Sequence, residues 1–130
     1  PPEAHEGVLR GMYRFRKSAK ESAADLWSVT SFSELARNGV AAETAWRHGA
    51  TSVMHSYVGE QLAATRGPIV IATDYVRAVP EQIRAFLPSG RRCVTLGTDG
   101  FGRSDTRAAL RAHFEVDAAA IVEASLCALG

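Results

Sequence analysis

The sequence predicts an α/β fold, a three-layer α/β/α domain built on a mostly parallel sheet with an edge strand. Short apolar or β-branched runs alternate with segments of helical composition along the chain. One such run, Cys93–Leu96, leads into a turn with glycines at positions 97, 100 and 102, and a helix-forming segment follows. Strands that alternate with helices indicate a parallel sheet covered on both faces. Functional sites of such sheets lie at the carboxyl ends of the strands.

The first quarter of the chain is predicted to hold an edge strand and a short connection. Residues 1–6 are typical of an extended lead-in. From Leu9 to Phe15 the side chains alternate in polarity, which is the pattern of a half-exposed strand. The polar residues 17–24 are too few for a parallel crossover with its helix, which needs at least ~10–12 residues.

The middle of the chain is predicted to be mainly helical. After a short β-favouring run, Leu26–Thr30, the Ser31 hydroxyl and the Glu34 carboxylate have the spacing of a capping box, which starts a helix. Gly39 is expected to end that helix, and residues 40–48 again have helical composition. A further helix over residues 52–64 is expected to bury a stripe of core residues. The stripe consists of Val53, Met54, Tyr57, Val58 and Leu62.

The second half predicts two further strands, each followed by a helix. Ile69–Thr73 is almost continuously apolar, as expected of a strand covered on both faces. Pro80 suits the first position of a helix that ends before Pro88, and residues 92–96 form the next strand. Ser104 or Asp105 can cap a short helix to His113, and Asp117 can cap a last helix. The packed face of this last helix is expected to contain Ile121, Val122, Ser125, Leu126 and Leu129.

Composition indicates one soluble, intracellular domain spanning residues 1–130. The formal net charge of +1 gives no electrostatic reason to expect nucleic acid or an anionic membrane as a partner. No apolar run is long enough to span a bilayer, and the first residues do not resemble a signal peptide. Cys93 and Cys127 lack partners at metal-ligand spacing and are expected to be reduced thiols.

The histidines do not form a metal site or a catalytic group in the sequence. None lies three or four residues from another histidine or from a cysteine, so the spacing of zinc ligands is absent. His113, Glu115 and Asp117 fall at the end of one predicted helix and the cap of the next, where helix dipoles account for them. No motif of a nucleophilic enzyme is present. We therefore predict no catalytic, cofactor-binding or metal-binding residue in this chain.

The glycine-rich turn is predicted to be a contact element. Its glycine spacing is reversed relative to the dinucleotide-binding fingerprint, which makes a nucleotide site the weaker interpretation. Glycines at these positions permit positive φ angles and close backbone approach, so the turn would present Phe101 and Arg103 to a neighbouring surface. Arg103 lies between Asp99 and Asp105 and is expected to form an ion-paired corner. These four residues are the candidate interdomain or subunit contact.

Several sequence blocks, in this order, extend the interpretation beyond physical pattern. They are G-M-Y-R-F at 11–15, W-S-V-T-S-F-S-E-L-A-R-N-G at 27–39, A-T-D-Y-V-R-A-V-P-E-Q-I-R-A-F-L-P at 72–88, and T-D-G-F-G-R-S-D-T-R at 98–107 followed by H-F-E-V-D at 113–117. In these blocks the chain resembles the C-terminal domain of the decarboxylating component of bacterial pyruvate dehydrogenase complexes, of the homodimeric, acetyl-transferring type. The resemblance implies a transketolase C-terminal-like fold.

The resemblance also implies a function for the whole enzyme. Enzymes of this family decarboxylate pyruvate with thiamine diphosphate and Mg²⁺ and acetylate the lipoyl group of a partner, the dihydrolipoyl acyltransferase. They are cytoplasmic homodimers. Their cofactor is held between the two preceding domains of two subunits, and no residue of this chain corresponds to those that hold it. The domain is implied to be a structural and subunit-contact element.

The chain departs from the family pattern between its first two blocks. A strand and a long helix are expected there, whereas about eight residues join Arg16 to Asp25. The chain is thus expected to be a fragment of a larger enzyme with this element missing near residues 17–25. Two alternatives of other classes remain at this point: a stand-alone, non-catalytic interaction or regulatory module on the same fold, and a small flavodoxin-like nucleotide binder.

Overall fold

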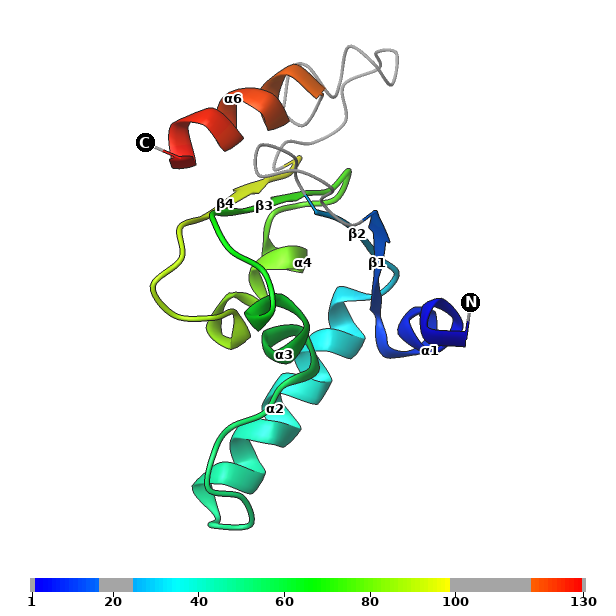
Figure 1. Ribbon diagram of the computed structural model, residues 1–130, viewed down its shortest axis with the longest axis vertical. Helices are drawn as coiled ribbons and strands as arrows, with labels where there is room; N and C mark the ends of the chain where they lie inside the picture. The colour runs from blue at the N-terminus through cyan, green and yellow to red at the C-terminus, as the bar shows by residue number, and fades with distance from the viewer. Residues whose placement is uncertain (1, 17–24, 99–117, 130) are drawn as a thin grey trace. The chain divides into compact units, whose positions relative to one another are not determined.

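The computed structural model of the protein describes residues 2–16, 25–98 and 118–129. Their elements, shown in Figure 1, are α1 (Pro2–Arg10), β1 (Met12–Arg16), β2 (Leu26–Val29), α2 (Phe32–Arg47), α3 (Tyr57–Ala63), β3 (Ile69–Ala72), α4 (Ala78–Glu81), the 3₁₀ turn η1 (Arg84–Phe86), β4 (Cys93–Leu96) and α6 (Ala118–Leu129). The chain divides into two compact units. The first comprises Pro1–Thr65 and Ala85–Pro88, and the second comprises Arg66–Arg84 and Ser89–Gly130.

The first unit begins with a helix, α1, where the sequence predicted an extended lead-in. Pro2 stands at the first helical position, where its missing N–H breaks no hydrogen bond. Glu6 and Arg10 pair one turn apart at 3.8 Å. Gly11, with φ of 105°, ends the helix, and its N–H donates to the Gly7 carbonyl at 2.9 Å. The prediction for residues 1–6 was wrong, and the strand expected from Leu9 begins only at Met12.

β1 and β2 form an antiparallel pair. Their register places Met12 opposite Val29 and Arg14 opposite Trp27, and the Arg14 guanidinium lies 4.9 Å from the Trp27 ring centroid. An antiparallel pair needs only a short connection, whereas a parallel pair needs a crossover. The pairing therefore agrees with the shortness of the polar segment that joins the two strands. The one parallel pair in the described residues is that of β3 with β4.

The start of α2 confirms one half of the predicted capping box. The Ser31 Oγ accepts a hydrogen bond from the Glu34 backbone N–H at 3.0 Å. The reciprocal half is wrong, because the Glu34 carboxylate instead accepts from the Arg37 guanidinium. The Ser31 backbone N–H is satisfied elsewhere: it donates to the Gly11 carbonyl at 3.2 Å.

α2 does not end at Gly39, as the sequence predicted, but continues as one helix to Arg47. The ring of Phe86, which belongs to the same unit, explains why a glycine stands at position 39 inside the helix. A Cβ on residue 39 would clash with this ring, so glycine is needed here for close packing and not for a turn. The helix tolerates it because a glycine inside a helix costs only about 1 kcal/mol relative to alanine.

The core of the first unit forms where α2, α3 and β1 meet. α3 begins at Tyr57, later than predicted, because the Ser56 Oγ caps it by accepting from the Gly59 N–H at 3.1 Å. The Tyr57 hydroxyl donates to the Met12 carbonyl at 2.8 Å, and its N–H donates to the Asn38 Oδ1 at 2.7 Å. The buried apolar side chains of this unit are Met12, Leu35, Tyr57, Val58, Leu62 and Phe86. Three of the five predicted stripe residues are among them; Val53 is exposed.

The second unit contains the parallel pair. β3 and β4 run in register from Ile69 opposite Cys93 to Ala72 opposite Leu96. The crossover between them holds α4 and η1, which replace the single helix predicted up to Pro88. Pro80 is the third residue of α4 and not the first. This crossover places the carboxyl ends of both strands at the same edge.

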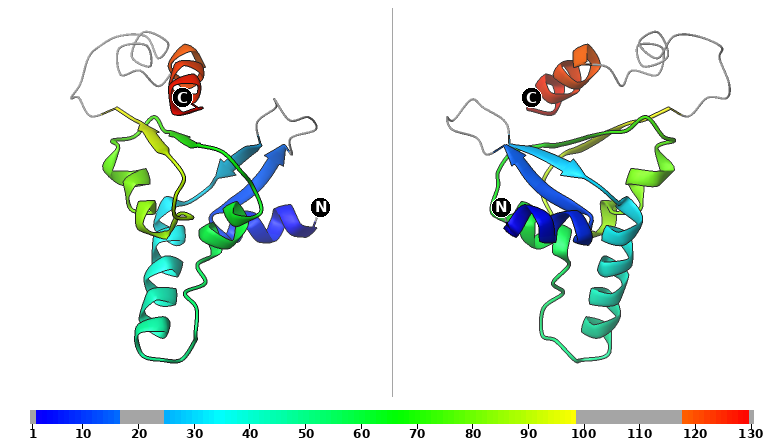
Figure 2. Two further views of the ribbon diagram at one scale, coloured as in Figure 1. Left: turned by 60° about the vertical axis from the view of Figure 1, so that its left-hand side comes forward. Right: turned by 90° about the vertical axis from the view of Figure 1, so that its right-hand side faces the viewer.

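α6 packs against both strands of the parallel pair, as two views in Figure 2 also show. The Arg92 guanidinium donates to the Ala128 carbonyl at 3.4 Å, so the residue just before β4 is held to the helix. Ala128 is buried and Ile121 and Ser125 are half-buried, so these residues form the packed face. Three residues predicted on that face are instead exposed: Val122, Leu126 and Leu129. The sequence analysis assigned them to the wrong face because the residues of α6 itself are apolar on nearly every face of the helix.

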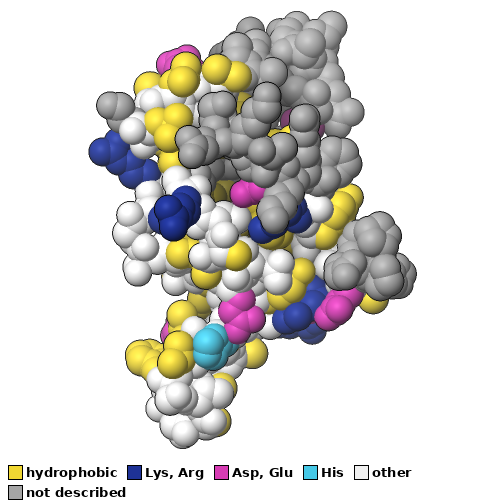
Figure 3. All heavy atoms as spheres, in the orientation of Figure 1, with side chains coloured by type: hydrophobic (Ala, Val, Ile, Leu, Met, Phe, Trp, Pro, Cys, Tyr) yellow, Lys and Arg dark blue, Asp and Glu magenta, His cyan; other side chains and the backbone are white. Residues whose placement is uncertain are grey.

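None of the helices in the described residues is long and apolar enough to cross a lipid bilayer. On the face shown in Figure 3, both basic and acidic side chains of the described residues are present. This distribution accords with the formal net charge of +1.

Candidate contact surface at the carboxyl ends of the parallel strands

The four predicted contact residues, Asp99, Phe101, Arg103 and Asp105, lie outside the described residues. The structure does describe the edge of the sheet from which this segment departs. That edge consists of the ends of β3 and β4 and of the turns that follow them, residues 73–77 and 97–98. We refer to these two turns as the carboxyl-edge turns.

Hydrogen bonds hold the two carboxyl-edge turns against each other. The Thr98 N–H donates to the Tyr75 carbonyl at 2.8 Å, and the Thr98 hydroxyl donates to the Asp74 carbonyl at 2.7 Å. Within the first turn, the Tyr75 N–H donates to the Thr73 Oγ1 at 3.1 Å. The Thr73 N–H donates to the Leu96 carbonyl at 3.0 Å and so extends the parallel ladder by one step. The turns therefore leave the sheet in a defined direction.

Gly97 permits this close approach of the two turns. A Cβ on residue 97 would stand 2.9 Å from the Tyr75 carbonyl oxygen, 3.0 Å from the Arg77 nitrogen and 2.7 Å from the Arg77 Cγ. Two of these three atoms belong to the backbone, so the clash could not be relieved by a side-chain movement alone. The predicted role of glycine in close backbone approach is thus observed at this position. The other two glycines of the motif are outside the described residues.

The carboxyl-edge turns expose a large aromatic side chain. Tyr75 is 71% exposed and its neighbour Val76 is 46% exposed. A rigid turn that presents an aromatic and an aliphatic side chain to solvent is typical of a contact surface, since tyrosine contributes large area at little entropic cost. Sequence reasoning did not identify Tyr75 as a site residue. The available signal was an aromatic residue placed in the turn directly after an apolar, half-buried strand.

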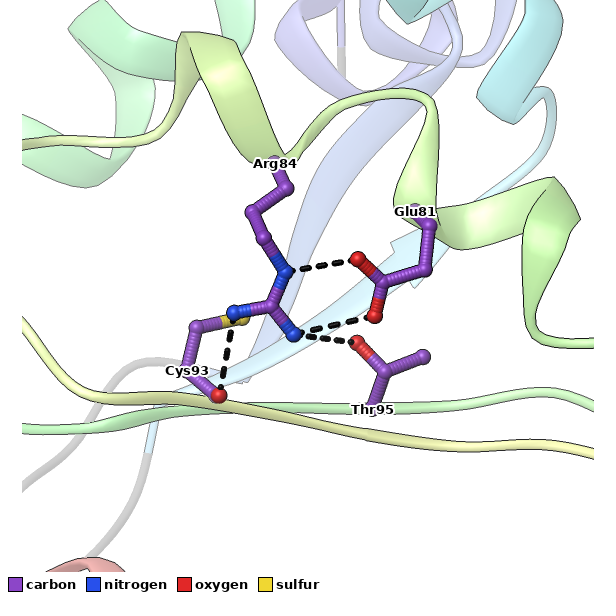
Figure 4. A network of polar contacts seen from close by, with 4 residues as sticks. All are labelled: Glu81, Arg84, Cys93 and Thr95. Atoms are coloured by element: carbon purple, nitrogen blue, oxygen red, sulfur yellow. Dashed lines mark hydrogen bonds and ion pairs between the residues drawn. The ribbon is translucent and has the colours of Figure 1, made fainter.

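A polar cluster of the second unit joins the crossover that follows β3 to strand β4. Figure 4 shows the Arg84 guanidinium in a two-point contact with the Glu81 carboxylate, with Nε–Oε2 at 2.6 Å and Nη2–Oε1 at 2.9 Å. The same guanidinium donates to the Cys93 carbonyl and to the Thr95 hydroxyl, each at 3.3 Å. These bonds tie the crossover to β4. The geometry is that of a structural clamp, because every polar group in it already has a partner within the cluster.

The electrostatics of this cluster do not produce a reactive group. The hydrogen bond from Arg84 lowers the pKa of Glu81, and the bond to Glu81 raises the pKa of Arg84, so both remain charged at neutral pH. Burial raises the pKa of the Cys93 thiol, which is therefore protonated and weakly nucleophilic. Cys127 is likewise a free thiol.

Within the described ranges, no group of three or more histidine, cysteine, aspartate or glutamate side chains is placed to hold a metal ion. His55 contacts a single carboxylate, that of Glu60, with Nδ1–Oε1 at 2.9 Å. At the carboxyl-edge turns, by contrast, hydrogen bonds hold the backbone in place and the side chains of Tyr75 and Val76 are exposed. These features are typical of a contact surface.

Comparisons with known proteins identify the family. The family described as "Transketolase-like TK C-terminal domain" matches residues 11–117. Among curated proteins, the chain is 40% identical over 160 residues to the "Pyruvate dehydrogenase E1 component" of Pseudomonas aeruginosa, covering 99% of this chain and 18% of that protein. It is 41% identical over 163 residues to the protein of the same name from Mycobacterium tuberculosis, with 99% and 17% covered. The relative from Mycolicibacterium smegmatis is 50% identical over 105 residues, with 80% and 11% covered.

The chain spans less than one fifth of the length of these relatives. The family match nevertheless covers most of the chain and includes α2, α3 and the whole parallel pair. The chain belongs to the family of transketolase-like C-terminal domains, and its fold is of the α/β class that the sequence predicted.

Proposed function

We propose that this chain is the C-terminal, subunit-contact domain of a pyruvate dehydrogenase E1 component. The observation that carries the proposal is the pattern of coverage: almost the whole chain aligns with proteins of that one name, in a region that amounts to less than a fifth of each. The full enzyme would decarboxylate pyruvate with thiamine diphosphate and Mg²⁺ and acetylate the lipoyl group of a dihydrolipoyl acyltransferase. It would act in the cytoplasm as a homodimer.

The contact role is proposed for the carboxyl edge of the parallel pair. Tyr75 is exposed on turns that the Thr98 hydrogen bonds fix in place, and the glycine-rich segment departs from the same edge. Rigid positioning favours association because little side-chain and loop entropy is lost when the partner binds. Phe101, Arg103 and the two flanking aspartates would continue this surface toward another domain or the second subunit.

The chain by itself is proposed to bind neither thiamine diphosphate nor Mg²⁺. Diphosphate sites use backbone N–H groups at helix starts, and Mg²⁺ sites use carboxylates together with phosphate oxygens. The carboxylate of Glu81 faces Arg84, and the N-terminus of α2 is capped by Ser31, so neither feature is oriented for these tasks. The cofactor would be held by the preceding domains of the full enzyme.

Titration calorimetry of the 130-residue chain with thiamine diphosphate and Mg²⁺ tests this assignment. The full-length enzyme serves as the positive control under the same conditions. We expect heat of binding for the full enzyme and none for the chain alone. Saturable micromolar binding to the chain alone would place cofactor-handling groups in this domain and would contradict the proposal.

A deletion relative to the family is also proposed, near residues 17–25. The alignment with the P. aeruginosa relative extends over 160 residues, although this chain has 130, so that relative carries about 30 additional residues within the matched region. The M. smegmatis alignment spans 105 residues and 80% of this chain, about 104 residues, so it is almost free of gaps. Wherever a continuous stretch of about 104 residues lies in a chain of 130 residues, it must include residues 27–104. This supports an insertion point outside that range, and the segment near residues 17–25 is one such place.

A further inference from the structure

The amino ends of the two parallel strands bring several cations to one edge of the second unit. Because β3 and β4 are parallel and in register, the turns that precede them, residues 66–68 and 89–92, meet at the same edge. We refer to these as the amino-edge turns. They contain three arginines, Arg66, Arg91 and Arg92, and no acidic residue. The described part of this edge is thus positively charged, in a chain whose formal net charge is only +1.

Hydrogen bonds hold the two amino-edge turns together. The Arg91 Nε–H donates to the Gly67 carbonyl at 2.6 Å, and the Ile69 N–H donates to the Arg92 carbonyl at 2.8 Å. The first bond joins a side chain of one turn to the backbone of the other, next to Arg66. The second is a backbone bond at the start of the parallel ladder. The places at which the cations leave the backbone are therefore fixed, which lowers the entropy lost when a partner binds.

The charges of Arg66 and Arg92 are not neutralised by the described part of the chain. Both residues are exposed, and neither forms an ion pair with a described residue. Arg92 donates from Nη1 to the Ala128 carbonyl at 3.4 Å, near the carboxyl end of α6, which Figure 1 shows at this same edge. A cation is favourable at that end of a helix, so the dipole of α6 accounts for part of the role of Arg92. Arg66 has no such partner among the described residues.

The surface around the amino-edge turns is open. A Cβ on Gly67 or on Gly90 would have no heavy atom within 4 Å other than those of its chain neighbours. A phosphate or another small anion is normally enclosed by backbone N–H groups or by a cavity, whereas an open surface suits a broader partner. Nucleic acids and anionic membranes attract proteins through a wider basic face, and the formal net charge of +1 favours neither.

We propose that the amino-edge turns form a docking surface for an acidic polypeptide, which is a segment or a face of another protein that presents aspartate and glutamate side chains. Guanidinium groups bind carboxylates in a planar, two-point geometry, which adds direction to the attraction between the charges. The partner's carboxylates pair with Arg66 and Arg92, and the bond from Arg91 to Gly67 holds the turn that carries Arg66. Exposed ion pairs are individually weak and are screened by salt, so the contact strengthens as the ionic strength falls.

Fluorescence anisotropy of a labelled peptide tests this proposal on the 130-residue chain. The probe is a synthetic peptide in which glutamate alternates with serine, and a peptide of the same length with glutamine in place of glutamate is the control. Inorganic triphosphate and a single-stranded DNA oligonucleotide are measured as competitors, because they represent the other classes of anion. Each titration is made at low and at high ionic strength.

Three substitutions that each remove one positive charge locate the binding site. Arg66→Gln and Arg92→Gln change the amino-edge turns, and Arg47→Gln is the matched control, because Arg47 is exposed and lies in the first unit. We expect the first two to weaken binding roughly threefold each and about tenfold together, and the control to leave it unchanged. Arg66→Gln should not alter urea unfolding, so it tests the site even if Arg92→Gln disturbs the end of α6. High salt should remove the differences.

Four outcomes would overturn the proposal. The glutamate peptide could fail to bind at low ionic strength, or the glutamine peptide could bind equally well. An equal loss with Arg47→Gln would mean that net charge alone attracts the peptide. Tighter binding of triphosphate or of DNA would assign this edge to another class of ligand. None of these measurements involves pyruvate or thiamine diphosphate, so a negative result leaves the proposed function untouched.

Discussion

Replacing Gly97 by alanine should separate the two carboxyl-edge turns. Without a steric conflict, such a change would stabilise the protein by about 0.4–1 kcal/mol, because alanine restricts the unfolded chain. Here the new Cβ would lie 2.9 Å from the Tyr75 carbonyl oxygen and 3.0 Å from the Arg77 nitrogen, so backbone must move. That movement breaks the two hydrogen bonds of Thr98, each contributing about 0.5–1.5 kcal/mol. The expected net loss is about 1–2 kcal/mol.

Hydrogen exchange and urea unfolding of the 130-residue chain measure this effect. The Thr98 amide donates the bond that spans the turns, so its exchange should accelerate in Gly97→Ala before any change in the core amides. Thr98→Val is the matched control: it removes the hydroxyl bond to Asp74, keeps the amide bond, and should cost only about 0.5–1.5 kcal/mol. A Gly97→Ala protein that is as stable as the unmodified chain, with an unchanged Thr98 amide, would refute the close approach.

Two further predictions concern the helix cap and the ion pair. Ser31→Ala leaves the Glu34 N–H unpaired and should cost about 0.5–2 kcal/mol, whereas Ser33→Ala, on an exposed residue inside the helix, should cost much less; equal losses in chemical denaturation would mean that Ser31 is not the cap. The pKa of Glu81 is lowered in the folded state by its guanidinium partner, so its contribution, roughly 0.2–1 kcal/mol for a solvent-screened pair, is present above the unfolded pKa of about 4.3 and is lost as the pH falls through the lower folded value. Glu81→Gln should therefore be less stable than the unmodified chain at pH 7 and equally stable at acid pH, and a difference independent of pH would contradict this.

The sequence was informative where a structure depends on neighbours along the chain. The Ser31 cap, the strand at Ile69 and the strand at Cys93 follow from local patterns, and all three are found within a residue or two of their predicted positions. Caps and apolar runs are satisfied within one or two turns of chain, so their signals are visible in a short window.

The errors arise where a distant residue decides the outcome. Gly39 reads as a helix stop, yet the Phe86 ring, 47 positions further along, makes it a packing position. The Glu34 carboxylate could complete a capping box, but Gly11 already accepts the N–H that it would have satisfied. The packed face of α6 could not be chosen because a nearly uniform apolar helix has no periodicity to indicate it.

The candidate surface was predictable only in part. The turn after β4 attracted attention through its glycines, and Gly97 does have the close contacts that such a glycine permits. Tyr75 was not identified, because its importance comes from the pairing of its turn with the turn that contains Thr98, 23 positions away. Parallel pairing brings the carboxyl ends of separate strands together, and a linear reading does not show which turns become neighbours.

The central claim is that this domain contributes contacts and not chemistry. The most direct measurement compares the full-length enzyme with its Phe101→Ala and Tyr75→Ala variants by sedimentation and by pyruvate kinetics. If these aromatic side chains contact another domain or subunit, each variant should weaken dimerisation by about tenfold or lower thermal stability, and leave the Michaelis constant for pyruvate unchanged. An intact, equally stable dimer with an altered Michaelis constant would make this edge a substrate contact and contradict the account.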